Sequence, residues 1–275
     1  MPGKARKSGP VIVARDPDAD FARFEGNPDF VLSLARGLRI IETFESHTEG
    51  RSVGDIARQT GLSRAAVRRS LLTLQLLGYG ETDGRVYRLT TRALRLGFSY
   101  LSSASLPTLA QPVLERITER VHESSSLSVL EGDEIVYIAR SAAKRVMSVG
   151  LSVGSRLPAY CSSMGRVLLA ALPEDRLSAY LRRVELKPLT PKTITNKKLL
   201  QEIVVRVRSD RFAMTDEELE LGLRSIAVPV LSRSGRVAAS MNIGVHAARV
   251  TAAEMIHRFL PILQEHAQAL GQVLA

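Results

Sequence analysis

The stretch SVGDIARQTGLSRAAVRRSLLTLQLLGYGETDGRVYRL, residues 52–89, decides the fold of the N-terminal part of the chain. Its first four residues, Ser52-Val53-Gly54-Asp55, form a capping-box pattern, which predicts the start of a short helix. Thr60-Gly61 breaks that helix. Ser63 can then cap another helix that runs to about Leu77, where a glycine follows as a stop signal.

A β-hairpin is predicted directly after these two helices. Two short strand-like runs, 79–82 and 85–89, flank Asp83-Gly84, and Asp-Gly is a strong hairpin signal because both turn positions favour positive φ. An amphipathic helix begins upstream near Phe30, with apolar residues spaced three and four apart. The order helix, helix, turn, helix, hairpin is typical of a winged helix-turn-helix. The apolar residues of the upstream helix are Leu34, Leu38, Ile41 and Phe44.

The helix that starts after Ser63 has two faces of different chemistry. Apolar Val67, Leu71 and Leu74 recur at i, i+4 and i+7 and are expected to face a core. The opposite face carries arginines in the first two turns, where a recognition helix meets the major groove and Arg can bond guanine or phosphate. A solvated basic face is the alternative. The residues opposite the core are Arg64, Ala65, Arg68 and Arg69.

Basic residues are concentrated in this segment, which favours the nucleic-acid interpretation. The chain carries a net charge of +10, and a basic excess suits a polyanionic partner. The hairpin would be the wing, whose arginines contact phosphates or the minor groove, although it could instead only pack on the helix. Ser52 could present backbone N–H groups to a phosphate or simply cap its helix. The candidate DNA-contacting residues are Arg36, Ser52, Ser63, Arg64, Ala65, Arg68, Arg69 and Arg85.

Length and composition bound the remaining possibilities. The chain has 275 residues, of which 45% are hydrophobic, so about two domains with real cores are expected. The lone Cys161 cannot form an intrachain disulfide, which indicates a reducing compartment and a cytoplasmic location. A run of about 18 apolar residues is absent from the sequence, so a membrane span is not expected. The basic N-terminus lacks the apolar region of a signal peptide.

The second half has the pattern of an α+β domain. Periods of two and turn residues predict strands that alternate with helical stretches, so an antiparallel sheet flanked by helices is expected. The predicted strands are 127–130, 135–139, 146–151, 212–214, 225–231 and 237–243. The predicted helices are 108–122, 162–172, 174–182, 199–208 and a closing helix at 251–274.

Several motifs make the sequence resemble the IclR family of bacterial regulators. The motifs of the family are Ser33–Leu38, the winged motif, Gly154–Pro158, Ser162–Arg166 and Glu220–Ala227. Two runs, 221–230 and Asn242–Val250, are closer still to the subgroup that controls aromatic-acid breakdown through the β-ketoadipate pathway (PcaR, PcaU and PobR types). The resemblance implies a GAF-like effector-binding domain, homodimers through the DNA-binding half, and often tetramers. One departure is Gly80, where the family often has an aliphatic residue, so the first wing strand is expected to be weak.

Composition, turn signals and the resemblance together divide the chain into four parts. We expect a mobile tail at 1–28, the winged helix-turn-helix at 29–92, a linker helix at 93–106 and the effector-binding domain at 107–275. An apolar stripe on the linker exceeds what a linker needs by itself, and we expect it to help pair two subunits. Its residues are Leu94, Leu96, Tyr100 and Leu101.

The resemblance also implies where an effector binds. In the family the effector lies between a loop-to-helix turn, an acidic segment and two strands. The N–H groups of Ser163 and Met164 at a helix start would hold a carboxylate. Thr215 stands where some members have Asp, and Asn242 and Gly244 share one strand face. The full set is Val146, Val149, Leu157, Ser163, Met164, Thr215, Leu223, Ser225, Asn242 and Gly244, and the expected ligand is a small acid such as protocatechuate, 4-hydroxybenzoate or β-ketoadipate.

Two other classes of function fit the sequence less well. An enzyme would need Cys161 to pair with His122 or His246 as a nucleophile, but no orienting group or nucleophile elbow is present, and the histidines lack metal spacing. Arg156 and Arg224 are alternative carboxylate partners or structural ion pairs. An architectural DNA-binding protein without a ligand would not need the large second domain. A regulator without metal or cofactor is therefore expected.

Overall fold

A computed structural model describes residues 24, 27–45, 49–96, 105–143 and 151–274. The chain divides into two compact units, Met1–Tyr100 and Leu101–Ala275, which are described separately. Among the described residues, no helix combines the length and the apolar character needed to cross a bilayer.

The N-terminal unit contains the predicted helices and hairpin in the predicted order. Its core is built from five buried aliphatic side chains, Ile40, Ile56, Val67, Leu71 and Leu74. The third helix therefore buries the predicted apolar face against the two helices before it. The elements are α2 (Leu32–Glu42), α3 (Val53–Thr60), α4 (Arg64–Leu76), β1 (Gly80–Thr82), β2 (Tyr87–Leu89) and η1 (Thr91–Ala93).

Side-chain caps explain where α3 and α4 begin. The Ser52 hydroxyl accepts the Asp55 N–H and the Ser63 hydroxyl accepts the Ala66 N–H, each at 3.2 Å. Both caps were predicted, since a serine oxygen satisfies an N–H that the first helical turn leaves unpaired. The Asp55 carboxylate accepts a bond from the Ser52 hydroxyl. Gly61 ends α3 with φ of 67°, which is a left-handed conformation that suits glycine.

The wing differs from the predicted two-residue turn. Gly84 has φ of 91°, but Asp83 is outside the positive-φ region, and the strands pair from Thr82 to Tyr87, which leaves a four-residue loop. The Asp83 carboxylate accepts hydrogen bonds from the backbone N–H groups of Arg85 and Val86, each at 2.9 Å. This side-chain turn replaces the tight backbone turn. The first strand includes Gly80, which pairs with Leu89.

The predicted linker helix is only partly within the described residues. Residues 91–93 form a 3-10 turn and 94–96 are helical. Leu94 and Leu96 are 72% and 48% exposed. Tyr100 and Leu101 lie outside the described residues, as does most of the predicted tail at 1–28.

The C-terminal unit contains a six-stranded antiparallel sheet with the order β5-β4-β3-β8-β7-β6. Consecutive strands therefore pair with each other on both sides of the sheet, and β8 joins the two sides by lying beside β3. The strands are β3 (Ser124–Glu131), β4 (Glu134–Ser141), β5 (Arg156–Pro158), β6 (Ala213–Asp216), β7 (Leu223–Leu231) and β8 (Val237–His246).

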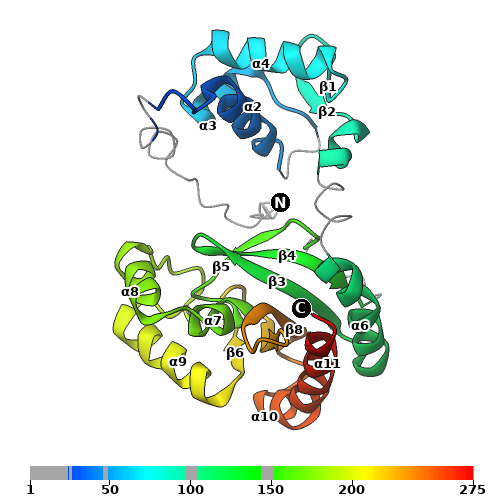
Figure 1. Ribbon diagram of the computed structural model, residues 1–275, viewed down its shortest axis with the longest axis vertical. Coiled ribbons are helices and arrows are strands. Elements are labelled where there is room, and N and C mark those ends of the chain that lie inside the picture. The colour runs from blue at the N-terminus through cyan, green and yellow to red at the C-terminus, as the bar shows by residue number, and fades with distance from the viewer. Residues whose placement is uncertain (1–23, 25–26, 46–48, 97–104, 144–150, 275) are drawn as a thin grey trace, which may run out of the picture. The chain divides into compact units, whose positions relative to one another are not determined.

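Helices cover both faces of this sheet, which confirms the predicted α+β layers (Figure 1). On one face, α6 (Ser105–Val121) and α11 (Leu260–Gln272) pack against a core that includes Leu127, Met241 and Ile243. On the other face, α7 (Ser163–Ala170), α8 (Glu174–Arg183) and α9 (Lys197–Asp210) pack around a second core. The sheet lies between these two cores.

Three elements depart from the sequence-based expectation. The short edge strand β5 was not predicted. The expected strand at 146–151 lies almost entirely outside the described residues. The closing helix is divided into α10 (Ala252–Glu254), a π-helical turn at Met255–Phe259 and α11. Pro261 lies in the first turn of α11, and it has no N–H to continue the α-helical bonding pattern backwards.

Candidate functional site

The predicted arginine face of α4 is open. Arg64, Arg68 and Arg69 are exposed, while Val67 is fully buried and Leu71 is 1% exposed on the opposite face. Three guanidinium groups thus project from the first two turns of the helix. Ala65 is also exposed on this face. The structure confirms the two faces, and the DNA contact itself stays a prediction.

Two further arginines of the N-terminal unit, Arg51 and Arg36, are less exposed than those of the α4 face. Arg51 is 9% exposed, donates to the Thr43 carbonyl at 2.6 Å and also bonds the Gln59 side chain. Its backbone pairs with Tyr87 of β2. Arg51 therefore joins the wing to the helices. The predicted candidate Arg36 on α2 is half-buried, and its Nε has no hydrogen-bond partner.

The wing keeps one exposed cation. Arg85 lies in the turn and is exposed, whereas Arg88 makes a 3.2 Å ion pair with Asp83. Bonds from the N–H groups of Val86 and Arg85 lower the pKa of Asp83 to about 2. The ionised carboxylate thus stabilises the turn that presents Arg85.

In the C-terminal unit, predicted effector residues lie on the sheet face covered by α7. Ser126 of β3 pairs with Asn242 of β8, and Ser225 of β7 pairs with both Gly244 and Thr215. Paired residues on neighbouring strands project from the same face of a sheet. The register therefore brings residues that are far apart in sequence into one polar patch.

Hydroxyl groups bridge this face to the start of α7. The Ser163 and Ser225 hydroxyls are 2.6 Å apart, and the Thr215 hydroxyl lies 3.2 Å from that of Ser225. Ser126, Ser163, Thr215, Ser225 and Asn242 are each at most 7% exposed. We call these five residues the hydroxyl–amide cluster.

The amide of this cluster is not fully partnered. The Asn242 Oδ1 atom is buried and has no hydrogen-bond partner. An unsatisfied buried acceptor costs about 1–3 kcal/mol. Such an atom calls for an explanation, and a bound molecule that donates a hydrogen bond to it is one.

Other predicted effector residues are near the cluster or farther along the sheet. Met164 is 1% exposed, and its sulfur lies 3.2 Å from the Ser128 hydroxyl. Leu223 borders Gly244, where an added Cβ would lie 3.9 Å from the leucine. Leu157 is on β5, three strands from Asn242 in the sheet order. Val146 and Val149 lie outside the described residues.

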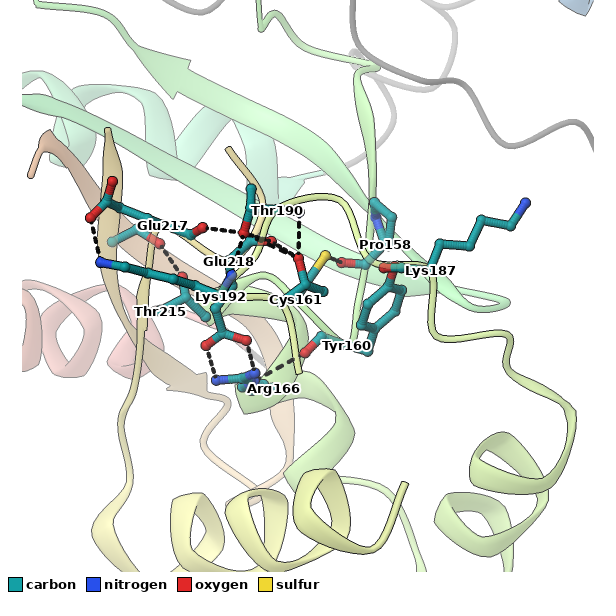
Figure 2. Close-up of polar contacts among 12 residues, drawn as sticks. Pro158, Tyr160, Cys161, Arg166, Lys187, Thr190, Lys192, Thr215, Glu217 and Glu218 are labelled. Carbon is teal, nitrogen blue, oxygen red and sulfur yellow. Dashed lines mark hydrogen bonds and ion pairs between the residues drawn. The ribbon is translucent and has the colours of Figure 1, made fainter. Parts of the chain in front are cut away.

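A buried ion pair holds α7 beside the loop that follows Thr215 (Figure 2). Arg166 donates through both terminal nitrogens to Glu218 and through Nε to the Tyr160 carbonyl. The Thr190 and Thr193 hydroxyls bond the carbonyls of the same loop. The loop and the helix start are thereby fixed relative to each other, which positions the hydroxyls of the cluster.

Arg156 and Arg224 have structural roles. Arg156 bonds both Glu131 and Glu134. Burial opposes its charge, but these carboxylates outweigh burial and raise its pKa. Arg224 bonds Asp216 and the carbonyl of Ala247. Of the two alternatives left open by the sequence, ion pairing within the protein is the observed one.

Cys161 has the environment of an inert core thiol. It is fully buried, and burial raises its pKa to about 12, so the thiol is protonated at neutral pH. Its sulfur lies 3.9 Å from the Pro158 carbonyl (Figure 2). His122 and His246 are exposed. The described residues contain no cluster of three or more His, Cys, Asp or Glu side chains suited to a metal ion.

Sequence reasoning missed two polar residues beside the predicted site. Ser126 and Arg140 pair with each other across β3 and β4, and the Arg140 guanidinium donates to the Ser126 hydroxyl at 3.1 Å. The alternation of polar and apolar residues in β3 was a signal for Ser126. The placement of Arg140 could not be predicted, because a bulge in β4 shifts the register.

Two described surface cavities lie apart from the cluster. One, of about 450 Å³, is lined by five residues of the N-terminal unit between Gly50 and Gln59. The other, of about 560 Å³, lies between the end of β7 and α11. Neither is lined by a predicted effector residue.

Two family models match the chain. The IclR helix-turn-helix domain matches residues 33–84, and the C-terminal domain of the bacterial transcriptional regulator IclR matches residues 98–272. Together they cover both structural units.

Individual relatives match most of the chain. It is 47% identical to a Pca regulon regulatory protein of Pseudomonas putida over 95% of this chain and 90% of that protein. It is 39% identical to a p-hydroxybenzoate hydroxylase transcriptional activator of Acinetobacter baylyi over 90% of this chain and 93% of that protein.

Solved structures agree with the fold. A proposed transcriptional regulator from Rhodococcus sp. RHA1 matches with a TM-score of 0.78 and 47% identity, over 88% of this chain and 98% of that one. A double mutant of the PobR inducer-binding domain from Acinetobacter, in complex with 3-hydroxybenzoic acid, matches with a TM-score of 0.60 and 34% identity, over 62% of this chain and all of that one.

Proposed function

The chain belongs to the IclR family of bacterial transcriptional regulators, and from that premise we propose that a small aromatic carboxylic acid controls its binding to DNA. The acid would bind at the hydroxyl–amide cluster of the C-terminal unit, and the arginine face of α4 would contact the operator. The observation that carries the ligand proposal is the buried, unpartnered Oδ1 atom of Asn242.

The open arginine face supports the proposed DNA contact. Arg64, Arg68 and Arg69 are exposed on the first two turns of α4, which is the part of a recognition helix that meets base edges. The exposed Arg85 of the wing would contact the phosphate backbone of the DNA. Such phosphate contacts fix the register of the protein on the duplex. The Ser52 and Ser63 caps present helix starts on the same unit.

The composition of the cluster supports a ligand that is both polar and planar. Four hydroxyl groups and one amide can bond a carboxylate or phenol, and the strand positions of Ser126, Thr215, Ser225 and Asn242 allow a ring to lie across the sheet face. Relatives point to the same chemical class, since one is an activator named for p-hydroxybenzoate hydroxylase and another holds 3-hydroxybenzoic acid. Protocatechuate, 4-hydroxybenzoate and β-ketoadipate are the acids to test first, and the regulated genes would serve the breakdown of aromatic compounds.

We propose further that the protein works as a homodimer or tetramer. Leu94 and Leu96 expose large apolar side chains, which are favourable to bury against a second copy. The acid would act by binding more tightly to one arrangement of the paired winged domains than to another. Sedimentation of the full chain should show a dimer or tetramer, and replacing Leu94 and Leu96 by Lys should shift it toward the monomer.

Titration of operator binding with aromatic acids tests the proposed function. The operator would be a duplex selected by the full-length protein from a random pool. A bound acid should also raise the melting temperature by mass action. A protein whose DNA binding and melting temperature respond to none of the acids would contradict the proposal and favour an architectural role.

A further inference from the structure

Arg140 is a half-buried cation whose charge has no acidic partner among the described residues. It lies on β4, where its Nη1 donates to the Ser126 hydroxyl at 3.1 Å. Its Nε is buried and makes no hydrogen bond. Burial lowers its pKa, opposed only by Tyr137. The guanidinium thus has one neutral acceptor and an unused donor.

The other buried or half-buried arginines of this unit are compensated differently. Arg166 has Glu218, Arg156 has two glutamates, and Arg224 has Asp216. Removing a charge from water without a partner is unfavourable. Arg140 is therefore the position where the protein retains a positive charge that an anion would compensate. Its planar fork matches the two oxygens of a carboxylate.

The strand register puts Arg140 at one end of the hydroxyl–amide cluster. Ser126 pairs with Arg140 on one side and with Asn242 on the other. The strands of Arg140 and Asn242 are thus two strand spacings apart, roughly 10 Å. The Ser163–Ser225 hydroxyl pair is on the far side of Asn242 from Arg140, because β7 follows β8. A single aromatic ring can separate a carboxylate at one end from a hydroxyl at the other.

We propose that Arg140 binds the effector's carboxylate, together with Ser126, and that the start of α7 reads the effector's hydroxyl end. This inference rests on the proposed function and refines it, because it reverses the orientation expected from the sequence, in which the N–H groups of Ser163 and Met164 hold the carboxylate. Ser163 and Ser225 then select acids that carry a hydrogen-bonding group opposite the carboxylate.

The test compares a charged ligand with its neutral counterpart. Calorimetry on the full-length protein would measure the Kd of 4-hydroxybenzoate and of 4-hydroxybenzamide, for the wild type, Arg140→Gln and Arg140→Lys. The wild type should prefer the acid by roughly 10–100-fold, since a hydrogen bond to a charged group contributes that much. Arg140→Gln should lose this preference and still bind the amide, and Arg140→Lys should keep part of it.

Arg156→Gln is the matched control, because it removes a guanidinium that already has two carboxylate partners on the same sheet. It should keep the preference for the acid. Binding of the amide by Arg140→Gln shows that the variant is folded, and its melting temperature provides a second check. If Arg140→Gln still prefers the acid by tenfold or more, the assignment of Arg140 is overturned and the proposed function stands. If the wild type binds neither compound nor any other aromatic acid, both are overturned.

Discussion

The hydroxyls of Ser163 and Ser225 lie 2.6 Å apart, although 62 residues separate them in the chain. Ser163 is the first residue of α7, and Ser225 is in the third position of β7. Thr215 extends the contact from β6 at 3.2 Å. The start of α7 and the strands β6 and β7 therefore share a short chain of three hydroxyl groups. A hydroxyl group of a ligand could replace one of these hydroxyls as the hydrogen-bond partner of another.

The first prediction concerns the energetic coupling of this pair. Ser163→Ala and Ser225→Ala should each lower the free energy of unfolding by about 0.5–1.5 kcal/mol, as expected for a lost hydrogen bond. The double variant should lose less than the sum, because the two residues share one bond. Urea denaturation of the three variants measures the coupling. Strictly additive losses would show that the contact contributes nothing.

The second prediction concerns the arginine face of α4. Arg68→Ala and Arg69→Ala should each weaken operator binding by about 1–3 kcal/mol if the guanidinium makes two hydrogen bonds to a base. If the side chain contacts a phosphate instead, the slope of log K against log salt concentration should fall by about one. Fluorescence anisotropy at several salt concentrations distinguishes these cases. Arg176→Ala, which removes an exposed arginine from α8, is the control and should bind as the wild type does. Wild-type binding by both α4 variants would mean that another face contacts DNA.

Local signals made much of the fold predictable. The serine caps of α3 and α4 and the apolar spacing of Val67, Leu71 and Leu74 are short-range patterns, and the structure contains what they predict. The wing turn was wrong in detail because the Asp83 side chain supplies bonds that a backbone turn was expected to supply. The three-residue strand β5 was missed, since three residues are too few to show a period.

The candidate site was less predictable, because it depends on pairing between distant strands. Ser225 and Asn242 were found through the resemblance, and their burial agrees with a site. Arg140 was missed because a bulge at Ile138 of β4 changes which β4 residues share the face of Ser126. Arg156 and Arg224 were ambiguous from sequence, since only the structure brings Glu134 and Asp216 beside them.

The third prediction concerns pH and the wing. The N–H groups of Val86 and Arg85 lower the pKa of Asp83 to about 2, from about 3.9 in an unfolded chain. The stabilisation is therefore complete above about pH 5 and is lost as the pH falls through 4 toward 2. Asp83→Asn should melt lower than the wild type at pH 6, and the gap should close toward pH 2.5. A constant gap would show that the carboxylate charge is irrelevant to the turn.

The fourth prediction concerns the close approach of α7 to the segment before it. A Cβ on Gly165 would lie 2.2 Å from the Ala159 carbonyl oxygen, so Gly165→Ala must displace backbone. We expect it to lower the free energy of unfolding by about 1–3 kcal/mol or more. Gly37→Ala is the control, because nothing lies within 4 Å of an added Cβ in that helix, and it should stabilise by about 0.5–1 kcal/mol. Calorimetric melting of both variants measures the two changes. Equal stability of Gly165→Ala and Gly37→Ala would contradict the prediction.

The last prediction separates ligand binding from stability at Asn242. Asn242→Leu removes the buried Oδ1 atom that has no partner, so the variant should be at least as stable as the wild type. It should nevertheless bind 4-hydroxybenzoate at least tenfold more weakly, since the amide is lost from the cluster.

Asn196→Leu makes the same substitution at the cap of α9, where Oδ1 accepts the N–H groups of Lys198 and Leu199. That control should cost about 0.5–2 kcal/mol of stability and leave acid binding unchanged. Calorimetry and thermal melting of both variants give opposite signatures if Asn242 belongs to the effector site. An Asn242→Leu variant that binds the acid as tightly as the wild type would place the site elsewhere in the C-terminal unit.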